Sequence, residues 1–430
     1  MFEVRSNRFK FGPGLIDHTG EETKALGVKR VFLVADPQIG KLDSYARVRD
    51  SLKRAQIDVV EYNENVSVEP TDVSFLAAGE AAREAGVDGF VSMGGGSVMD
   101  TTKAAALLSR YPDDILAYCN APIGQGKAVP GPVAPHLAIP TTPGTGAEAT
   151  GYAICDVLSM HAKTGIASRA LIPTAALVDP EVVYTCPTNV IVASGFDVLS
   201  HAVESYCARP FTDRPRAYSP MMALGQGRNP FSDFGCLETL RLVGQYFMRA
   251  VEDPSDTEAR TNMHFAATLA GVAIGNAGTA LPHGMSYAVS GLVEADQIPY
   301  CPDGYKDRGG FAHAHPLVPH GMAVISCAPS SFRKTFAASP ERHLEAARLL
   351  GGDVRTAHGD DAGEVLADVI IDFMRKSGLP NGLKGIGFTP DDVPRLVARA
   401  APQRRVMDNA PITVNEEVLA DLFKDSMTYW

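Results

Sequence analysis

The feature that most constrains the fold is an alternation of short apolar runs with helical segments in the first 185 or so residues. Runs rich in Val, Ile and Phe occupy residues 31–36, 58–63, 89–94, 136–142 and 175–180. Residues 73–86 lie between two of these runs and are typical of a helix. Such alternation indicates βαβ units on a parallel sheet. We therefore predict an α/β domain over residues 1–186.

After about residue 187 the pattern changes to that of helices. Apolar residues recur at helical intervals between Leu240 and Val251, and Ser255-x-x-Glu258, Ser339-Pro340 and Thr389-Pro390 are typical helix starts. Two long irregular stretches, 209–230 and 291–316, interrupt this half, and such loops are usually functional. A chain of 430 residues is too long for one ordinary core. We predict an all-helical domain over residues 187–430, with the active site in the interdomain cleft.

A glycine-rich turn, Gly94 to Asp100, follows the run at 89–94 and opens a helix. Glycines let backbone N–H groups approach a pyrophosphate, and the helix N-terminus favours its negative charge. A second loop of small hydroxyl residues and glycines, 140–148, also follows a strand. Asp36 ends an earlier strand, where a carboxylate suits a ribose 2′-hydroxyl and favours NAD over NADP. The alternatives are a ligand-free turn and an ordinary loop aspartate.

Four residues further along suit a metal ion. Asp197 and His201 lie four positions apart in a predicted helix, and His283 and His320 are each followed by glycine. One carboxylate with three imidazoles suits Fe(II), Zn(II) or a similar divalent ion. An Asp–His pair at this spacing is also common as a surface hydrogen bond. His313 and His315 are the substitutes if His320 is not a ligand, whereas the apolar surroundings of His264 predict a core histidine.

Composition excludes several classes of partner. The net charge of −11 argues against nucleic acid and anionic membranes. No apolar run approaches the ~20 residues that span a bilayer, and the N-terminus lacks the apolar region of a secretory signal. Seven cysteines occur without a CxxC pair, which is typical of reduced thiols. We expect a cytoplasmic protein that acts on a small molecule.

The motifs GGGSVMDTTK, PTTPGTGAE, GFDVLSHAVESY, HGMSY and PHGMA together resemble the iron-containing (group III) alcohol dehydrogenases, in the same order and over essentially the whole chain. The resemblance implies a Rossmann-like NAD-binding domain, a helical domain that holds Fe(II) or Zn(II), and often a homodimer. By motif position, the implied metal ligands are Asp197, His201, His283 and His320. The implied nucleotide contacts are Gly95, Gly96, Ser97, Asp100, Thr141, Thr142, Thr145 and Lys163.

Two departures are similar to the hydroxyacid–oxoacid transhydrogenase branch of that family. Many members have a histidine four residues after the third ligand, where this chain has Tyr287, a candidate proton relay. In addition, 37 positions separate His283 from His320, so an insertion lies between them. The segments VEPTD (68–72) and NAPIGQGK (120–127) are also similar to that branch. The branch interconverts 4-hydroxybutyrate and 2-oxoglutarate with succinic semialdehyde and 2-hydroxyglutarate.

We therefore predict a metal-dependent, NAD-linked oxidoreductase that transfers hydride between a small alcohol or hydroxy acid and nicotinamide. A metal ion favours loss of the hydroxyl proton, and an alkoxide releases hydride more readily than an alcohol. One alternative is a transhydrogenase that retains its NAD and uses 2-oxoglutarate as acceptor. Others are a lyase similar to dehydroquinate synthase and a non-catalytic binding module. A carboxylate substrate needs a guanidinium, for which the candidates are Arg209, Arg214, Arg216 and Arg228.

Overall fold

The computed structural model describes residues 1–160, 162–214, 224–293 and 317–430, which form two compact units. One unit contains Ser6–Cys186, and the other contains Met1–Arg5 with the described chain from Pro187 onward. The first five residues thus belong to the helical unit, although the sequence pattern assigns them to the α/β domain. Backbone N–H groups explain this, because Glu3 donates to Gln226 (2.8 Å) and Arg5 donates to Asn276 (3.0 Å).

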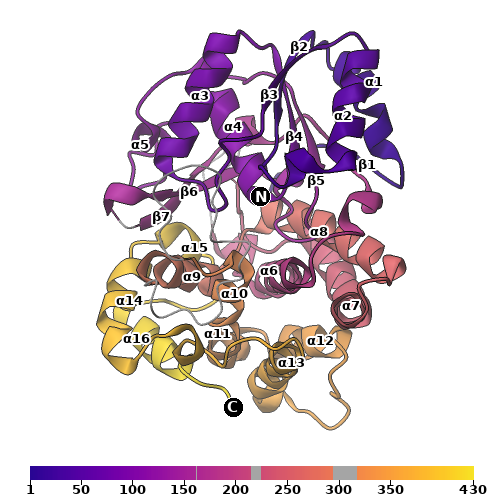
Figure 1. The fold of residues 1–430 in the computed structure, drawn as a ribbon. Helices are drawn as coiled ribbons and strands as arrows, with labels where there is room; N and C mark the ends of the chain where they lie inside the picture. Colours follow the sequence, from indigo (N-terminus) through magenta and orange to yellow (C-terminus); the bar gives the residue numbers. More distant parts are fainter. Residues whose placement is uncertain (161, 215–223, 294–316) are drawn as a thin grey trace. The chain divides into compact units, whose positions relative to one another are not determined.

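A six-stranded, wholly parallel sheet forms the centre of the α/β unit (Figure 1). Its order is β1-β8-β5-β4-β2-β3, and the five predicted runs correspond to the last five strands of that order. The strands are β1 (Arg8–Phe11), β2 (Arg30–Val34), β3 (Asp58–Tyr62), β4 (Gly89–Gly94), β5 (His136–Pro140) and β8 (Ala175–Val178). The α/β prediction is therefore confirmed.

One hairpin in this unit was not predicted. Strands β6 (Tyr152–Val157) and β7 (Ala162–Ala167) pair antiparallel as a separate two-stranded sheet. The sequence of β7, AKTGIA, contains only one large apolar residue, so it lacks the apolar alternation by which a strand is recognised. The hairpin matters for the site because it carries Lys163.

Both faces of the parallel sheet are covered by helices. Successive side chains of a strand point to opposite faces, so Val31 and Leu33 of β2 pack on one side while Phe32 and Val34 pack on the other. Figure 1 shows α1 and α2 beside one face and α3 and α4 beside the opposite one. The helices of the unit are α1 (Thr19–Ala25), α2 (Asp43–Arg54), α3 (Asp72–Ala85), α4 (Gly96–Arg110) and α5 (Ile115–Tyr118).

Helices alone form the described regular structure of the second unit, which confirms the all-helical prediction. They are α6 (Thr188–Cys207), α7 (Pro230–Glu252), α8 (Thr257–Ala277), α9 (Leu281–Leu292), α10 (His320–Ile325), α11 (Ala328–Thr335), α12 (Pro340–Leu349), α13 (Ala362–Lys376), α14 (Val393–Ala400), α15 (Arg404–Met407) and α16 (Glu416–Asp425). In the described chain no single helix is long and apolar enough to cross a membrane, and α8 with α9 passes that test only as a pair bent by 103°.

Two of the three predicted helix starts are confirmed. Pro340 is the first residue of α12, and Thr389 caps a 3₁₀ turn that leads into α14. The start at Ser255 is wrong, because Ser255 bonds back to Asp253 and the cap of α8 is Asp256, which accepts from Ala259 N–H. Of the two irregular stretches, residues 215–223 and 294–316 lie outside the described chain.

Candidate metal centre and nucleotide loops

The helical unit buries a carboxylate and an imidazole on one turn of α6. Asp197 and His201 are 3 % and 4 % exposed. A separation of four residues places them on the same helix face, and His201 Nε2 lies 3.4 Å from Asp197 Oδ1. The surface alternative for this pair is therefore wrong, because both side chains lie inside the unit.

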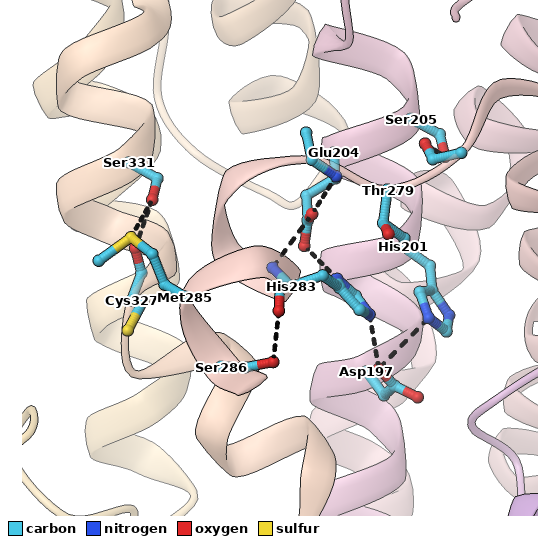
Figure 2. Close-up of polar contacts among 12 residues, drawn as sticks. Asp197, His201, Glu204, Ser205, Thr279, His283, Met285, Ser286, Cys327 and Ser331 are labelled. Atoms are coloured by element: carbon cyan, nitrogen blue, oxygen red, sulfur yellow. Dashed lines mark hydrogen bonds and ion pairs between the residues drawn. The ribbon is translucent and has the colours of Figure 1, made fainter. Parts of the chain in front are cut away.

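Two more imidazoles approach the same oxygen. His283, in the first turn of α9, places its Nε2 3.5 Å from Asp197 Oδ1, and His320, the first residue of α10, places its Nε2 3.8 Å away. Asp197, His283 and His320 each offer a ligand atom within 4.8 Å of the other two. Figure 2 shows His201 and His283 both directed at Asp197. The structure thus brings all four predicted ligands together around one carboxylate oxygen.

The glycine after each of the later histidines allows helices to approach closely. A Cβ at Gly321 would lie 1.9 Å from the carbonyl oxygen of Ala193 in α6. A Cβ at Gly284 would lie 2.6 Å from Met407 Cε of α15. Both separations are shorter than van der Waals contact. The two His-Gly pairs therefore combine a candidate ligand with the close packing that positions it.

The geometry of Asp197, His283 and His320 fits a shared divalent cation, and His201 approaches the same carboxylate oxygen. Asp197 Oδ1 and His283 Nε2 are buried and have no hydrogen-bond partner in the described chain. The three N···O distances, 3.4 to 3.8 Å, exceed normal hydrogen bonds. Ligands about 2.1 Å from one tetrahedral ion lie about 3.4 Å from each other. A cation among these atoms would satisfy polar groups for which the described residues provide no partner.

Electrostatics within the cluster favour the ligand-competent forms of Asp197 and His201, whereas the nearby carboxylates favour the protonated form of His283. Burial raises the pKa of Asp197, but the imidazoles of His201, His320 and His283 outweigh it and hold that pKa below its usual range. Burial lowers the pKa of His201 to about 3. Burial also acts to lower the pKa of His283, yet Glu204 and Asp197 raise it to about 10. An ionised carboxylate and a neutral imidazole are the forms that bind metals, so a metal ion bound by His283 would displace the proton from its Nε2.

Glu204 is a site residue that the sequence reasoning missed. Its side chain is fully buried, and Oε1 lies 2.6 Å from His283 Nδ1 (Figure 2). Oε2 accepts the N–H of Ala280 at 2.7 Å. A ligating histidine usually donates its second ring N–H to a carboxylate or carbonyl. The available signal was its position three residues after His201, on the same face of α6.

The remaining candidates of this unit have varied surroundings. Tyr287 lies one turn after His283 in α9 and is buried, and its relay role stays a prediction. His264 is buried in α8, as expected of a core histidine. Arg209 donates to the carbonyls of Ala410 and Ile412, and Arg214 donates to the carbonyl of Gly225 and the side chain of Asn409, so both have structural contacts. Arg228 is half-buried, whereas Arg216, His313 and His315 lie outside the described residues.

In the α/β unit, the predicted nucleotide residues follow neighbouring strands. Asp36 follows β2, Gly95 to Ser97 follow β4, and Thr141 to Thr145 follow β5. These three strands are adjacent in the sheet, and the strand order reverses between β2 and β4. Ligands of such sheets bind beyond the carboxyl ends of the strands at this reversal. The topology therefore places the predicted residues where a dinucleotide is expected.

The two loops pack closely against each other at two glycines. A Cβ at Gly95 would lie 3.1 Å from Thr142 Oγ1, and a Cβ at Gly96 would lie 2.6 Å from Thr145 Cγ2. The N-terminus of α4 has no side-chain cap, and Thr141 Oγ1 is buried without a hydrogen-bond partner in the described chain. These features leave donors for an anion and fit a pyrophosphate.

Asp36 and Asp100 both take part in protein contacts. Asp36 Oδ1 accepts the N–H groups of Gln38 (2.8 Å) and Ile39 (2.9 Å), which leaves Oδ2 outside these bonds, and burial raises the pKa of this carboxyl. Asp100 contacts Lys103 Nζ (3.2 Å) through Oδ1 and accepts Ile154 N–H (3.0 Å) through Oδ2. The contacts of Asp100 tie α4 to β6. The nucleotide roles of both residues stay predictions.

Lys163 points into a group of carboxylates in the same unit. Its side chain is 3 % exposed and forms ion pairs with Glu69 and, at 3.5 Å, with Asp156. Its predicted contact with the nicotinamide ribose stays a prediction.

Comparison with known proteins identifies the class. The sequence model "Iron-containing alcohol dehydrogenase" matches residues 6–180, and "Fe-containing alcohol dehydrogenase family, C-terminal" matches residues 191–295 and 311–427. The chain therefore belongs to the iron-containing alcohol dehydrogenase family and is an oxidoreductase. This result excludes the two alternative predictions, a lyase and a non-catalytic binding module.

Individual relatives are more specific. The chain is 45 % identical over 429 residues to "Hydroxyacid-oxoacid transhydrogenase, mitochondrial" of Bos taurus, covering 99 % of this chain and 90 % of that protein. A solved 1,3-propanediol oxidoreductase matches with TM-score 0.84 and 25 % identity, over 99 % of this chain and 100 % of the other. Sulfoacetaldehyde reductase from Bifidobacterium kashiwanohense, in complex with NAD⁺, matches with TM-score 0.78 and 25 % identity over 99 % of each chain.

The comparison corrects one expectation. The sequence was expected to be that of a cytoplasmic protein, but the Bos taurus relative and its other vertebrate counterparts are named as mitochondrial. The expectation relied on the absence of a secretory signal and on cysteine usage. Neither feature distinguishes the cytoplasm from the mitochondrion.

Proposed function

We propose that this protein is a hydroxyacid–oxoacid transhydrogenase that uses a bound nicotinamide cofactor and a divalent metal ion. The observation that carries the proposal is the convergence of three imidazoles on one buried carboxylate oxygen. The Bos taurus relative supports the substrate class, since it matches nearly the whole chain. The NAD⁺ complex of the reductase neighbour supports the cofactor.

The proposed reaction is balanced between two acids. A hydride from C4 of 4-hydroxybutyrate would be transferred to C2 of 2-oxoglutarate. The hydroxyl proton lost by the first substrate is regained by the second. The products are succinic semialdehyde and 2-hydroxyglutarate, and the cofactor returns to its oxidised form. In this cycle the nicotinamide supplies a hydride acceptor and donor that need not leave the protein.

Different residues of the chain would bind the metal ion and the cofactor. Asp197, His201, His283 and His320 would hold the cation, which supplies positive charge that favours loss of the substrate's hydroxyl proton. Glu204 fixes the ring of His283 through Nδ1. Gly95, Gly96 and the N-terminus of α4 would receive the pyrophosphate. Iron(II) is the proposed ion, and Zn(II) is the alternative that the same ligands accept.

A second candidate is an NAD-linked dehydrogenase that releases NADH in every turn. The match to 1,3-propanediol oxidoreductase favours it. The two functions require the same metal and nucleotide residues and differ in what happens to the reduced cofactor.

The predicted cleft between the two domains and the homodimer are further parts of the proposal. Sedimentation analysis at several protein concentrations tests the dimer.

A single assay separates these functions. The purified protein is loaded anaerobically with Fe(II), mixed with 4-hydroxybutyrate, and followed at the NADH absorbance with NAD alone and then with 2-oxoglutarate. The transhydrogenase yields 2-hydroxyglutarate without accumulating free NADH. Free NADH accumulating at a comparable rate identifies the dehydrogenase. Failure in both arms, also with simple alcohols, contradicts the proposed function.

A further inference from the structure

The backbone of Glu69 adopts a conformation that is unusual for its residue type. Its φ angle is 53°, in the left-handed region that favours glycine. This backbone conformation is energetically unfavourable for a non-glycine residue, so contacts with the surrounding structure must stabilise it. The neighbours do so, because Pro70 accepts the N–H of Asp156 (2.8 Å) and Thr71 forms a β-bridge to Asp156 and caps α3.

This conformation lets one residue contact two predicted nucleotide-binding residues. The N–H of Glu69 donates to Ser97 Oγ at 3.1 Å, in the first turn of α4. Its carboxylate forms an ion pair with Lys163 Nζ of β7, and the two side chains are 15 % and 3 % exposed. Glu69 therefore connects Ser97 of α4 to Lys163 of β7. Glu69 lies in the segment VEPTD, which belongs neither to the candidate metal-binding motifs nor to the glycine-rich loop.

The contacts of Glu69 fix the orientation of the donor groups of Ser97 and Lys163. Because Ser97 Oγ accepts from Glu69, its hydroxyl proton remains available for an acceptor such as a phosphate oxygen. Lys163 has three N–H donors, and Glu69 with Asp156 fixes the position of its ammonium. A fixed donor pair loses less conformational freedom when a ligand binds.

We infer that Glu69 is a positioning residue for the dinucleotide, which presets Ser97 and Lys163 and slows release of the cofactor. The inference rests on the proposed function, in which the nucleotide stays bound through a cycle. A carboxylate that acted only by its charge would repel the pyrophosphate, so its removal would tighten binding. A carboxylate that positions the two donors has the opposite effect.

The test measures binding of NADH without turnover. NADH affinity is measured by fluorescence titration of the full chain, and its dissociation rate by stopped-flow displacement with excess NAD. We compare E69Q with D72N, which makes the same charge change three residues away. Asp72 Oδ1 accepts Leu158 N–H (3.3 Å) and so also contacts the hairpin region, but it contacts neither Ser97 nor Lys163 in the contacts recorded for the described chain.

We expect E69Q to weaken NADH binding about tenfold, mostly through faster dissociation, and D72N to stay within twofold of the wild type. The variant E69N repeats the test with a residue that tolerates positive φ but is too short to keep the Lys163 contact, and it should also weaken binding. If both Glu69 variants bind NADH as D72N does, or more tightly, the inference is wrong while the function stands. If the wild type itself binds no NADH, it is the proposed function that fails.

Discussion

At the scale of single residues, the metal centre depends on the orientation of one imidazole. The carboxylate of Glu204 has two tasks, since Oε1 pairs with His283 Nδ1 and Oε2 accepts Ala280 N–H. With its proton held on Nδ1, His283 directs Nε2 to Asp197 and would present it to the proposed cation. The structure therefore assigns the choice of tautomer to a residue that is not itself a ligand.

The variant E204Q tests this assignment. Glutamine has one acceptor oxygen, so its amide N–H₂ must face either Ala280 N–H or His283 Nδ1, and the second arrangement moves the ring proton onto Nε2. We expect metal affinity to fall about 10- to 100-fold, measured by competition with a chromophoric chelator. The matched control is S205A, which removes a neighbouring buried bond from Ser205 to the carbonyl of Gly278. Equal affinities of the two variants would contradict the role of Glu204.

His136 provides a pH-dependent prediction away from the metal. Its Nε2 lies 2.7 Å from Ser92 Oγ, and burial, together with the charge of Lys103, lowers its pKa to about 3. Below pH 6.5 the unfolded chain binds a proton that the folded chain does not, so the free energy of unfolding falls as pH falls from 6.5 towards 3. The loss attributable to His136 at pH 5 is about 2 kcal/mol.

The measurement is urea unfolding at pH 7 and pH 5 for the wild type and H136Q. Glutamine keeps a hydrogen-bonding side chain but does not titrate. The variant should lose about 2 kcal/mol less between the two pH values. An identical pH dependence would show that His136 is not the group responsible.

At the scale of elements, the ligands depend on how closely helices approach. Gly321 lies where α10 meets α6, and a Cβ there would be 1.9 Å from Ala193 O and 3.0 Å from Asp197 N. The variant G321A should therefore displace α10 together with His320. We expect metal affinity to fall at least tenfold, whereas G351A, at a helix end with open space around its Cβ, should lose stability through its positive φ but bind metal normally. Metal titration of both variants gives the comparison.

Element by element, the sequence predicted what depends on local pattern. The strands β2 to β5 and β8 were recognisable from apolar runs, and the α6 ligand pair from its spacing. The β6–β7 hairpin was missed because its apolar pattern is weak. Glu69 and Glu204 were missed for another reason: their partners Lys163 and His283 lie 94 and 79 positions away in the chain. Tertiary packing sets contacts at such separations, and the periodicity of a sequence does not predict them.

At the scale of the whole molecule, the proposed metal ion would join elements that are distant in the sequence. The candidate ligands come from α6, α9 and α10, so a cation that binds only the folded chain would stabilise it by mass action. At a free metal concentration one hundred times Kd, the gain is about 2.7 kcal/mol. Calorimetry should show a higher Tm when Zn(II) is added to the chelator-treated protein, and no such rise for D197N. A rise of equal size in D197N would remove Asp197 from the ligand set.

The most direct test of the central claim follows the hydride itself. The metal-loaded protein is given 4-hydroxybutyrate deuterated at C4, 2-oxoglutarate and a large excess of unlabelled free NADH, and the 2-hydroxyglutarate is analysed by mass spectrometry. A cofactor that stays bound carries the label directly, so we predict deuterium at C2 of the product in nearly every early turnover. Product without deuterium would mean that the nicotinamide exchanges with solution in each cycle, which contradicts the transhydrogenase.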